Sequence, residues 1–295
     1  LYPNDPAQIQ GMTAPPSTVW ADPGFLSTAP VSAQFMRIPS GSPAEDAGDP
    51  TSPVLTDFEG TPRPNNQGFD IGADEIGNCY VRINGAAPTY GNVQRAIEQS
   101  LDGDVLYVAG TCRGANPVVT PQGTLTQTAY VTRSLGFQGG YLPTNWIEPK
   151  PDVYTTTFDA AGVGRVMVID GSAVVTVTGL HLTGGYADVG GGVWVSGTTV
   201  VTLTNSHIYS NSVSGAGGGV YQGGGHLILD GNRLYGNIAG DNGGAVAHAG
   251  GEMVLQNNFV YGNVAANGAG VYDGSAASLT ALHNTFYQNQ ATTAG

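Results

Sequence analysis

The sequence predicts an all-β fold built from stacked coils, and three observations support that prediction. Similar segments recur with a period of about 26 residues and end in the same residue type, at Asn211, Asn237, Asn263 and Asn289. Gly-rich runs that end in valine lie between them, as at 217–220. Stretches such as 226–229 alternate polar and apolar residues, which is the two-residue period of a half-buried strand.

A repeat of this length without a helix cannot bury its apolar side alone, so successive repeats must stack. We therefore expect a right-handed parallel β-helix of about 26 residues per coil, with two or three short strands in each repeat. Glycine runs would allow the tight turns between strands, because glycine tolerates positive φ angles.

In such a stack, equivalent side chains lie above one another. We expect three inward apolar columns. They contain Leu203, Leu229, Leu255 and Ala281; Leu182, Ile208, Leu234, Val260 and Phe286; and Val193, Val220, Val246 and Val271.

Asparagine forms two further columns, which we expect to be buried. One contains Asn211, Asn237, Asn263 and Asn289, and the other contains Ser206, Asn232, Asn258 and Asn284. Buried asparagine amides in register can hydrogen-bond along a stack. These ladders are therefore predicted to support the architecture rather than to bind a ligand.

Tyrosine recurs two residues before each terminal asparagine, at Tyr209, Tyr235, Tyr261 and Tyr287. Alternation points these side chains outward as an aromatic stripe with a step of about 4.8 Å. The stripe could bind sugar rings or a neighbouring filament. The alternative is that stacked tyrosines only favour strand pairing.

The chain is acidic, with 9 Lys and Arg against 22 Asp and Glu and a net charge of −13. This charge argues against nucleic acid or an anionic membrane surface as a partner. No apolar run reaches 18 residues, so we expect no membrane insertion. The first residues lack the features of a signal peptide, which predicts a processed chain or an internal piece. The composition is typical of a secreted bacterial surface protein, so the expected location is extracellular or at the cell surface.

Residues 1–77 are predicted to be a Pro- and Gly-rich closing or linking segment, because prolines interrupt any long regular element. The motifs at 22–25, 41–48, 56–64 and 69–75 resemble the closing, anchor-type segment that follows the last coil in large secreted bacterial β-helix proteins. That resemblance implies a cap for a coil stack. Here the segment precedes the coils.

Residues 78–112 are predicted to form a capping unit with an amphipathic helix over 90–101, because apolar residues recur at helical spacing. A helix at this end would shield the core of the first coil. A strand is expected to begin at Asp104. Cys79 and Cys112 would join the strands before and after the helix as a disulfide, and two buried free thiols are the alternative.

Residues 113–165 are expected to form irregular early coils, and 166–295 the regular ones. The glycine–valine runs, together with Phe286 to Asn289, resemble the repeats of chlamydial polymorphic outer-membrane proteins, which implies a role in adhesion. Three coils depart from that pattern, with Ile208, Leu234 and Val260 in place of the Phe.

The order of these parts suggests that the chain is one period of a head-to-tail array, or a permuted subunit whose first segment completes its neighbour. Copies of the chain, joined end to end, would then be partners, because an open coil end is an unpaired strand edge. Glycans or another cell surface are further expected partners. The alternative is a truncated chain.

Enzymes also occur on β-helices, so we considered a polysaccharide lyase or hydrolase. Glycoside hydrolysis needs two carboxylates on one face. The acids of the coils after Ser206 occupy different columns, and the five histidines are scattered, although His181 and His207 share an outward column. We therefore predict no catalytic residue and no cofactor. The acids of the first segment could bind Ca²⁺, with solvated turn carboxylates as the alternative; they are Asp57, Glu59, Asp70, Asp74 and Glu75.

The sequence therefore predicts a noncatalytic, extracellular structural protein, a β-helix module of a cell-surface fibre with adhesion as a related role. The alternatives are a polysaccharide-active enzyme on the same fold and a monomeric adhesin that binds glycans or a host.

Overall fold

The computed structural model describes residues 42–44, 47–48, 70–71, 79–120 and 123–294. The chain divides into two units, residues 1–78 and 79–295, and the coils belong to the second. Within the first unit, the Ile71 N–H donates to the Ala44 carbonyl at 2.8 Å. The predicted closing segment and most of its acids lie outside the described residues; Asp70 is described and is buried.

The second unit begins with a small cap. It consists of β1 (Cys79–Ile83), β2 (Ala86–Tyr90), α1 (Val93–Gln99) and β3 (Val105–Arg113). The helix is shorter than the predicted 90–101, because Tyr90 pairs with Val81 in a strand and the Asn92 side chain caps the first turn by accepting from the Arg95 N–H at 3.1 Å.

Helix α1 turns its apolar side to the protein core. Val93, Ala96 and Ile97 are buried and belong to the same hydrophobic cluster as the coil interior. Strand β1 pairs antiparallel with β3. A disulfide between Cys79 and Cys112 links these two strands, which confirms the predicted bridge.

The early coils contain β4 (Asn116–Thr120), β5 (Gly123–Val131), β6 (Leu135–Tyr141), β7 (Thr157–Asp159) and β8 (Arg165–Ile169). Strands β4 and β5 form an antiparallel pair. The later strands pair in parallel, β5 with β8 and β6 with both β3 and β9. The irregular part of the chain is therefore already wound as coils.

Each of the first four regular coils has four strands, not the two or three predicted. The first coils are β9 (Val174–Thr178), β10 (His181–Thr183), β11 (Tyr186–Ala187) and β12 (Val193–Val195), then β13 (Val200–Thr204), β14 (His207–Tyr209), β15 (Ser212–Val213) and β16 (Val220–Gln222). The next are β17 (His226–Asp230), β18 (Arg233–Tyr235), β19 (Ile238–Ala239) and β20 (Val246–His248), then β21 (Glu252–Gln256), β22 (Phe259–Tyr261), β23 (Val264–Asn267) and β24 (Val271–Asp273). The last described coil has β25 (Leu279–Leu282), β26 (Thr285–Tyr287) and β27 (Gln290–Ala294). The additional strand was missed because it can be two residues long, too short to show alternation.

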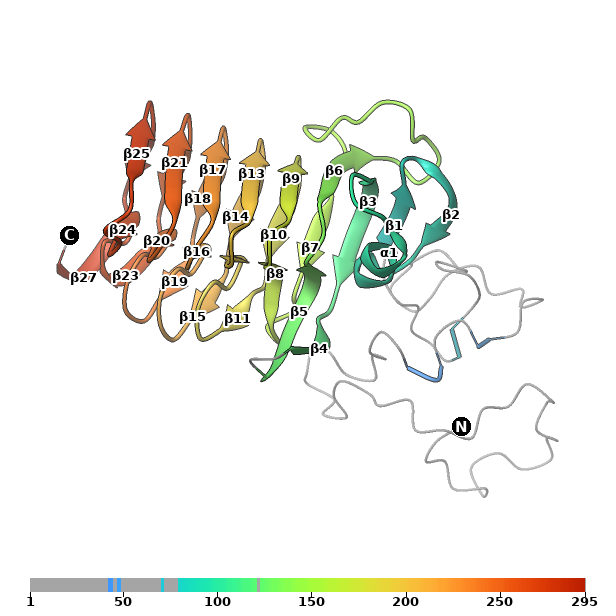
Figure 1. Ribbon diagram of the computed structural model, residues 1–295, viewed down its shortest axis with the longest axis horizontal. Helices are drawn as coiled ribbons and strands as arrows, with labels where there is room; N and C mark the ends of the chain where they lie inside the picture. The colour runs from blue at the N-terminus through green and yellow to red at the C-terminus, as the bar shows by residue number, and fades with distance from the viewer. Residues whose placement is uncertain (1–41, 45–46, 49–69, 72–78, 121–122, 295) are drawn as a thin grey trace, which may run out of the picture. The chain divides into compact units, whose positions relative to one another are not determined.

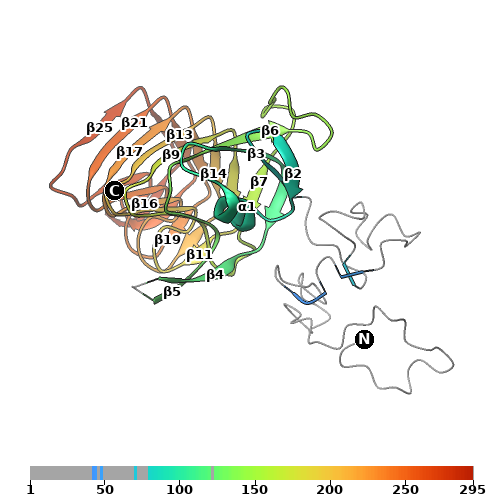
Figure 2. The ribbon, with the colours of Figure 1, turned by 45° about the vertical axis from the view of Figure 1, so that its right-hand side comes forward.

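Equivalent strands of successive coils pair in parallel and in register (Figure 1). One series runs β9–β13–β17–β21–β25, and the next runs β10–β14–β18–β22–β26. Two further series run β11–β15–β19–β23–β27 and β12–β16–β20–β24. Figure 2 shows the strands of these series following one another along the stack. The second unit is therefore an all-β parallel β-helix, as predicted.

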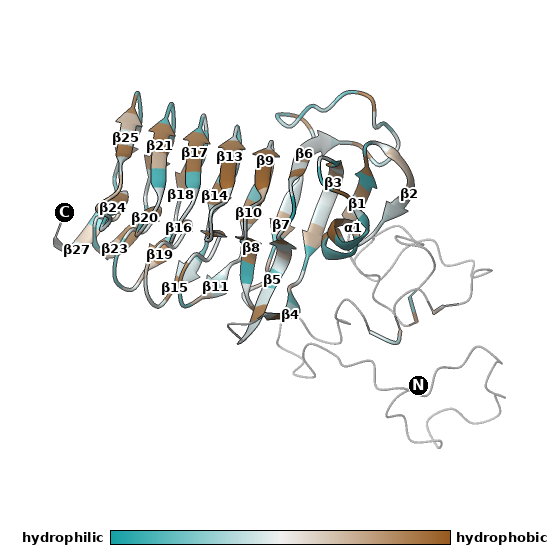
Figure 3. Cartoon of the chain, viewed as in Figure 1, coloured by the Kyte–Doolittle hydropathy of each residue, from teal (hydrophilic) through white to brown (hydrophobic). Residues whose placement is uncertain are grey.

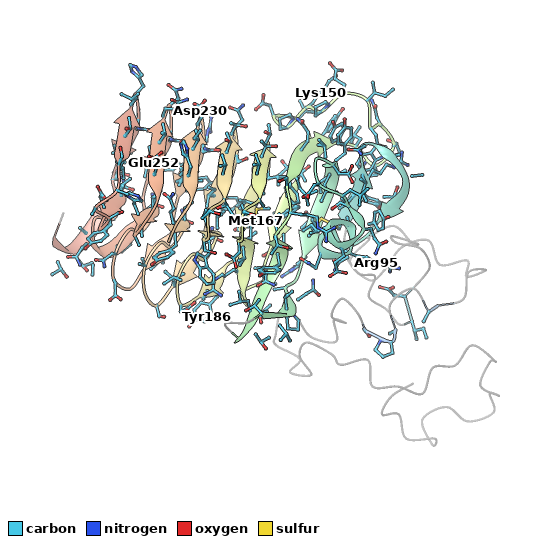
Figure 4. The ribbon with its side chains drawn as sticks, viewed as in Figure 1. Arg95, Lys150, Met167, Tyr186, Asp230 and Glu252 are labelled. Carbon is cyan, nitrogen blue, oxygen red and sulfur yellow. A yellow bond between two sulfur atoms is a disulfide. The ribbon has the colours of Figure 1, made fainter. Side chains whose placement is uncertain are left out.

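The inside of the coils is the hydrophobic core, and most members of the predicted columns lie there. Ala281 and Phe286, which were also expected to face inward, are exposed on the last described coil. Leu203 pairs in register with Leu229, which pairs with Leu255. All three are buried, and each buried leucine stabilises the fold by about 1.5–3 kcal/mol. Figure 3 shows the apolar residues concentrated in the strands. Met167 of β8, labelled in Figure 4, is fully buried in the same core.

Glycine is required at some turns because a Cβ atom would not fit, and at others only because the backbone has a positive φ angle. Gly217 has φ +70°, and a Cβ there would lie 2.5 Å from the Val220 carbonyl oxygen. Gly236 also has a positive φ, but a Cβ there would meet nothing within 4 Å. Ser210 occupies the equivalent position one coil earlier with φ +53°. A side chain is therefore tolerated at the Gly236 position, whereas Gly217 leaves no room for one.

Candidate functional surface

The first asparagine ladder runs through the buried corner after β14, β18, β22 and β26. The Asn237 Oδ1 accepts from both the backbone N–H and the Nδ2 of Asn211, at 3.2 and 3.0 Å. The Asn237 Nδ2 donates to the Ile208 carbonyl at 2.9 Å and to the Asn263 Oδ1 at 3.0 Å. The same bonds join Asn263 to Asn289.

The second ladder repeats this arrangement at the corner before those strands. The Asn258 Oδ1 accepts from the N–H and Nδ2 of Asn232, and the Asn284 Oδ1 accepts in the same way from Asn258. Ser206 takes the place of an asparagine in this ladder: its N–H donates to Asn232, and its Oγ accepts from the Leu180 N–H. The amides of both ladders bond to one another and to backbone carbonyls, so their geometry suits the joining of coils rather than the capture of a ligand.

The outward tyrosines form a stack on the next surface. Tyr209 and Tyr235 have ring centroids 4.9 Å apart and planes 1° from parallel. Tyr235 and Tyr261 follow at 5.0 Å and 8°. Tyr287 holds the next position in register and is 56% exposed. The predicted stripe of four is therefore a stack of three rings followed by a more open tyrosine.

A second column of rings lies beside these tyrosines. His181 and His207 stack with centroids 4.3 Å apart, and the His207 ring also meets the Tyr235 ring edge to face at 6.1 Å. Phe259 packs at a tilt against Tyr261 at 4.7 Å. We call the six rings together the aromatic face; they are His181, His207, Tyr209, Tyr235, Phe259 and Tyr261.

Phe259 was not predicted as part of this surface from the sequence. The signal was present, because Phe259 lies two residues before Tyr261, just as His207 lies two before Tyr209. On a strand, residues two apart share a face. The column was hard to recognise because its members differ in type, with Arg233 between His207 and Phe259.

The aromatic face carries little charge. Burial, and secondarily His207, lowers the pKa of His181 to about 4. Burial and then Arg233 lower the pKa of His207, while Asp152 opposes that shift. Burial raises the pKa values of Tyr209 and Tyr235. At neutral pH the face therefore presents neutral imidazoles and protonated phenols.

The lowered pKa of His181 predicts a loss of stability in acid. The unfolded histidine takes up a proton near pH 6.5, and the folded one only near pH 4. The contribution of His181 to the free energy of unfolding is therefore full above pH 6.5 and falls between pH 6.5 and about 4. Below about pH 4 this contribution does not change further. We expect a loss of about 1–2 kcal/mol, below the full linkage value because the ring is partly solvated.

Urea unfolding at a series of pH values will measure this effect. The control is His181→Gln, which removes the titrating ring, so the difference between the native chain and the variant isolates His181 from the carboxylates. The free energy of unfolding of the native chain, relative to that of the variant, should fall as the pH is lowered from 6.5 to about 4. A difference that stays constant from pH 7 to pH 4 would contradict the expectation.

The acids of the later coils lie opposite other residue types. Asp230 is in register with Thr204 and Gln256, and Glu252 with His226. Asp273 is in register with His248. Figure 4 labels Asp230 and Glu252, which lie at opposite ends of neighbouring strands. None of these three acids is in register with another carboxylate.

One acid, Asp273, does form a pair with a histidine, which was not predicted from the sequence. His248 is fully buried. Its Nδ1 lies 2.8 Å from the Asp273 Oδ1, and its Nε2 lies 2.7 Å from the Gly251 carbonyl oxygen. Because both ring nitrogens already contact oxygens of the chain, this histidine is held in the structure rather than presented to a substrate.

Across the residues that the structure describes, no three His, Cys, Asp or Glu side chains come together as a metal site would require. The acids expected to bind Ca²⁺ lie outside this part of the chain, apart from Asp70. The one described helix is too short to cross a membrane.

Comparison with known proteins gave one match. Residues 156–294 match a family model described as the right handed beta helix region. Searches of curated proteins and of solved structures found no match. With the parallel coils described above, the match supports a right-handed β-helix fold for this part of the chain. Regions of this kind occur in polysaccharide-active enzymes and in noncatalytic proteins, so the fold alone does not assign a function.

Proposed function

We propose that this protein is a noncatalytic extracellular structural module, a β-helix of a cell-surface fibre with adhesion as a related role. The observation that carries the proposal is the pair of asparagine ladders. From the coil that begins at β13 onward, they join each coil to the next through repeated side-chain bonds, alongside the backbone bonds of the parallel strands. A rod built in this way distributes force along its axis over many equivalent contacts.

The disulfide supports the extracellular location. Disulfides persist in oxidising surroundings and are rare in the cytosol. Cys79 and Cys112 are each only 2% exposed, so the bond lies within the cap and serves structure. The net charge of −13 suits a soluble surface protein.

The fibre proposal includes end-to-end association of copies. The predicted role of residues 1–77 in closing a neighbouring stack remains a prediction, because most of that segment lies outside the described residues.

Two experiments test the proposal. Antibodies raised against the purified protein should label fibres on intact cells in immunogold electron microscopy; labelling confined to the cytosol would refute the proposal.

In the second experiment, incubation of the protein with a panel of neutral and acidic polysaccharides should release neither reducing ends nor unsaturated sugars. Release that depends on one of the coil acids would favour the enzyme instead.

A further inference from the structure

We propose that the aromatic face binds a linear neutral polysaccharide lying parallel to the coil axis. This proposal goes beyond the structural role and is independent of it. It rests on the shape of the aromatic face, on which parts of its rings are exposed, and on its charge.

The aromatic face is long and narrow. It extends over four neighbouring strands, β10, β14, β18 and β22, which at about 4.8 Å per step gives roughly 14 Å. Its width is that of two residues on the same side of a strand, about 7 Å. A specific protein partner usually buries about 800 Å² on each side, several times the area of this strip. A chain of linked rings fits it better than a globular partner.

The exposed parts of the rings suit a sugar. Tyr209, Tyr235 and Tyr261 partly cover one another's faces by stacking, and all three remain partly exposed to solvent. Phe259 is 39% exposed and tilts 37° from the Tyr261 ring. Sugars have both C–H surfaces and hydroxyls, and aromatic side chains with polar tips match that mixture.

The spacing of the rings is regular. Because adjacent coils pair in register, one tyrosine follows another at 4.9 and then 5.0 Å. A polymer with a repeating ring unit can make the same contact at several successive positions. Each contact is weak, but several made by one chain act together and raise the overall affinity.

Charge favours a neutral polymer over an acidic one. His181 and His207 are uncharged at neutral pH, because burial lowers the pKa of each. The charged groups around them are Arg233 on β18, Asp152 between β6 and β7, and Asp159 on β7, which is 3.5 Å from Arg113. The two carboxylates offset the two guanidinium groups. The net charge of −13 further repels a polyanion.

Affinity gel electrophoresis tests this proposal. The folded chain is run through native gels that contain either a dissolved neutral polysaccharide (a glucan, mannan, xylan or galactan) or a polyuronate. We expect at least one neutral polymer to retard the chain and the polyuronate to leave its migration unchanged. Retardation by the polyuronate alone, or by none of these polymers, would overturn the proposal.

Three variants assign the binding to this surface. Phe259→Ser, at an exposed position, should weaken retardation about tenfold. Tyr235→Phe, which keeps the stacked ring and removes the hydroxyl, should weaken it a few-fold. The matched control is Tyr186→Ser on β11, an exposed tyrosine labelled in Figure 4 that belongs to a different strand series from the aromatic face; it should bind as the native chain does.

Circular dichroism and thermal unfolding will show that each variant is folded. A folded Phe259→Ser chain that is retarded as strongly as the native chain would refute the assignment. Cleavage of the polymer in these gels would contradict the noncatalytic role proposed above but not the binding, so the two proposals fail by different results.

Discussion

Replacing Asn237 by alanine should lower the free energy of unfolding by about 3–5 kcal/mol. The substitution leaves the backbone N–H and Nδ2 of Asn211 and the Ile208 carbonyl without the bonds that Asn237 makes to them. These groups are buried, and each unsatisfied buried polar group costs about 1–3 kcal/mol. Local relaxation and entry of water reduce the sum.

Equilibrium urea unfolding, followed by circular dichroism, measures this loss. Asn242→Ala is the matched control, because Asn242 is only partly buried and its side chain accepts one bond, from the Asn267 Nδ2 at 2.9 Å. We expect that control to lose about 1 kcal/mol or less. Equal losses for the two variants would show that the ladder contributes no more than an ordinary surface contact.

A second variant separates the two halves of the amide. Asn237→Asp keeps an oxygen that can accept from Asn211, but it replaces the Nδ2 donor with an oxygen that faces the Ile208 carbonyl. At pH 7 the buried charge should destabilise the chain at least as much as alanine does. In acid the protonated carboxyl can donate again, so part of the stability should return.

The repeat explains why so much of the coil interior could be predicted. A column is visible in the sequence whenever the same residue type returns once per coil, as Leu203, Leu229 and Leu255 do. Register follows from that, since a shift by one residue would turn each leucine outward. Gln222 and His248 occupy one inward column but differ in type and are polar, so the rule that apolar residues face inward gave no signal for the His248–Asp273 pair.

Parts of the chain without a period could not be placed from sequence. Asp152 influences the pKa of His207 from a segment between two strands, and no spacing rule connects these residues. The helix was overestimated because Tyr90 fits a helical pattern equally well but gains backbone bonds to β1. The aromatic face contains residues of both kinds. Its tyrosines recur in successive coils and were predicted from the repeat, whereas Phe259 does not recur and was identified only in the structure.

Removing the disulfide should lower the free energy of unfolding by about 3–4 kcal/mol. The bond joins residues 33 apart in sequence, and a closed loop of that size restricts the unfolded chain by about this amount. The variant is Cys79→Ala with Cys112→Ala. Alanine leaves little extra strain but also removes two buried sulfur atoms, so part of the loss will come from packing.

Reduction of the native chain separates these two contributions. A chain reduced in denaturant and refolded with reductant keeps both sulfur atoms and loses only the link. Its urea midpoint should fall most of the way to that of the double variant, whose own midpoint should not respond to reductant. If reduction leaves the midpoint unchanged, the cap is held by Val93, Ala96 and Ile97 against the coil core, and the disulfide adds nothing to its stability.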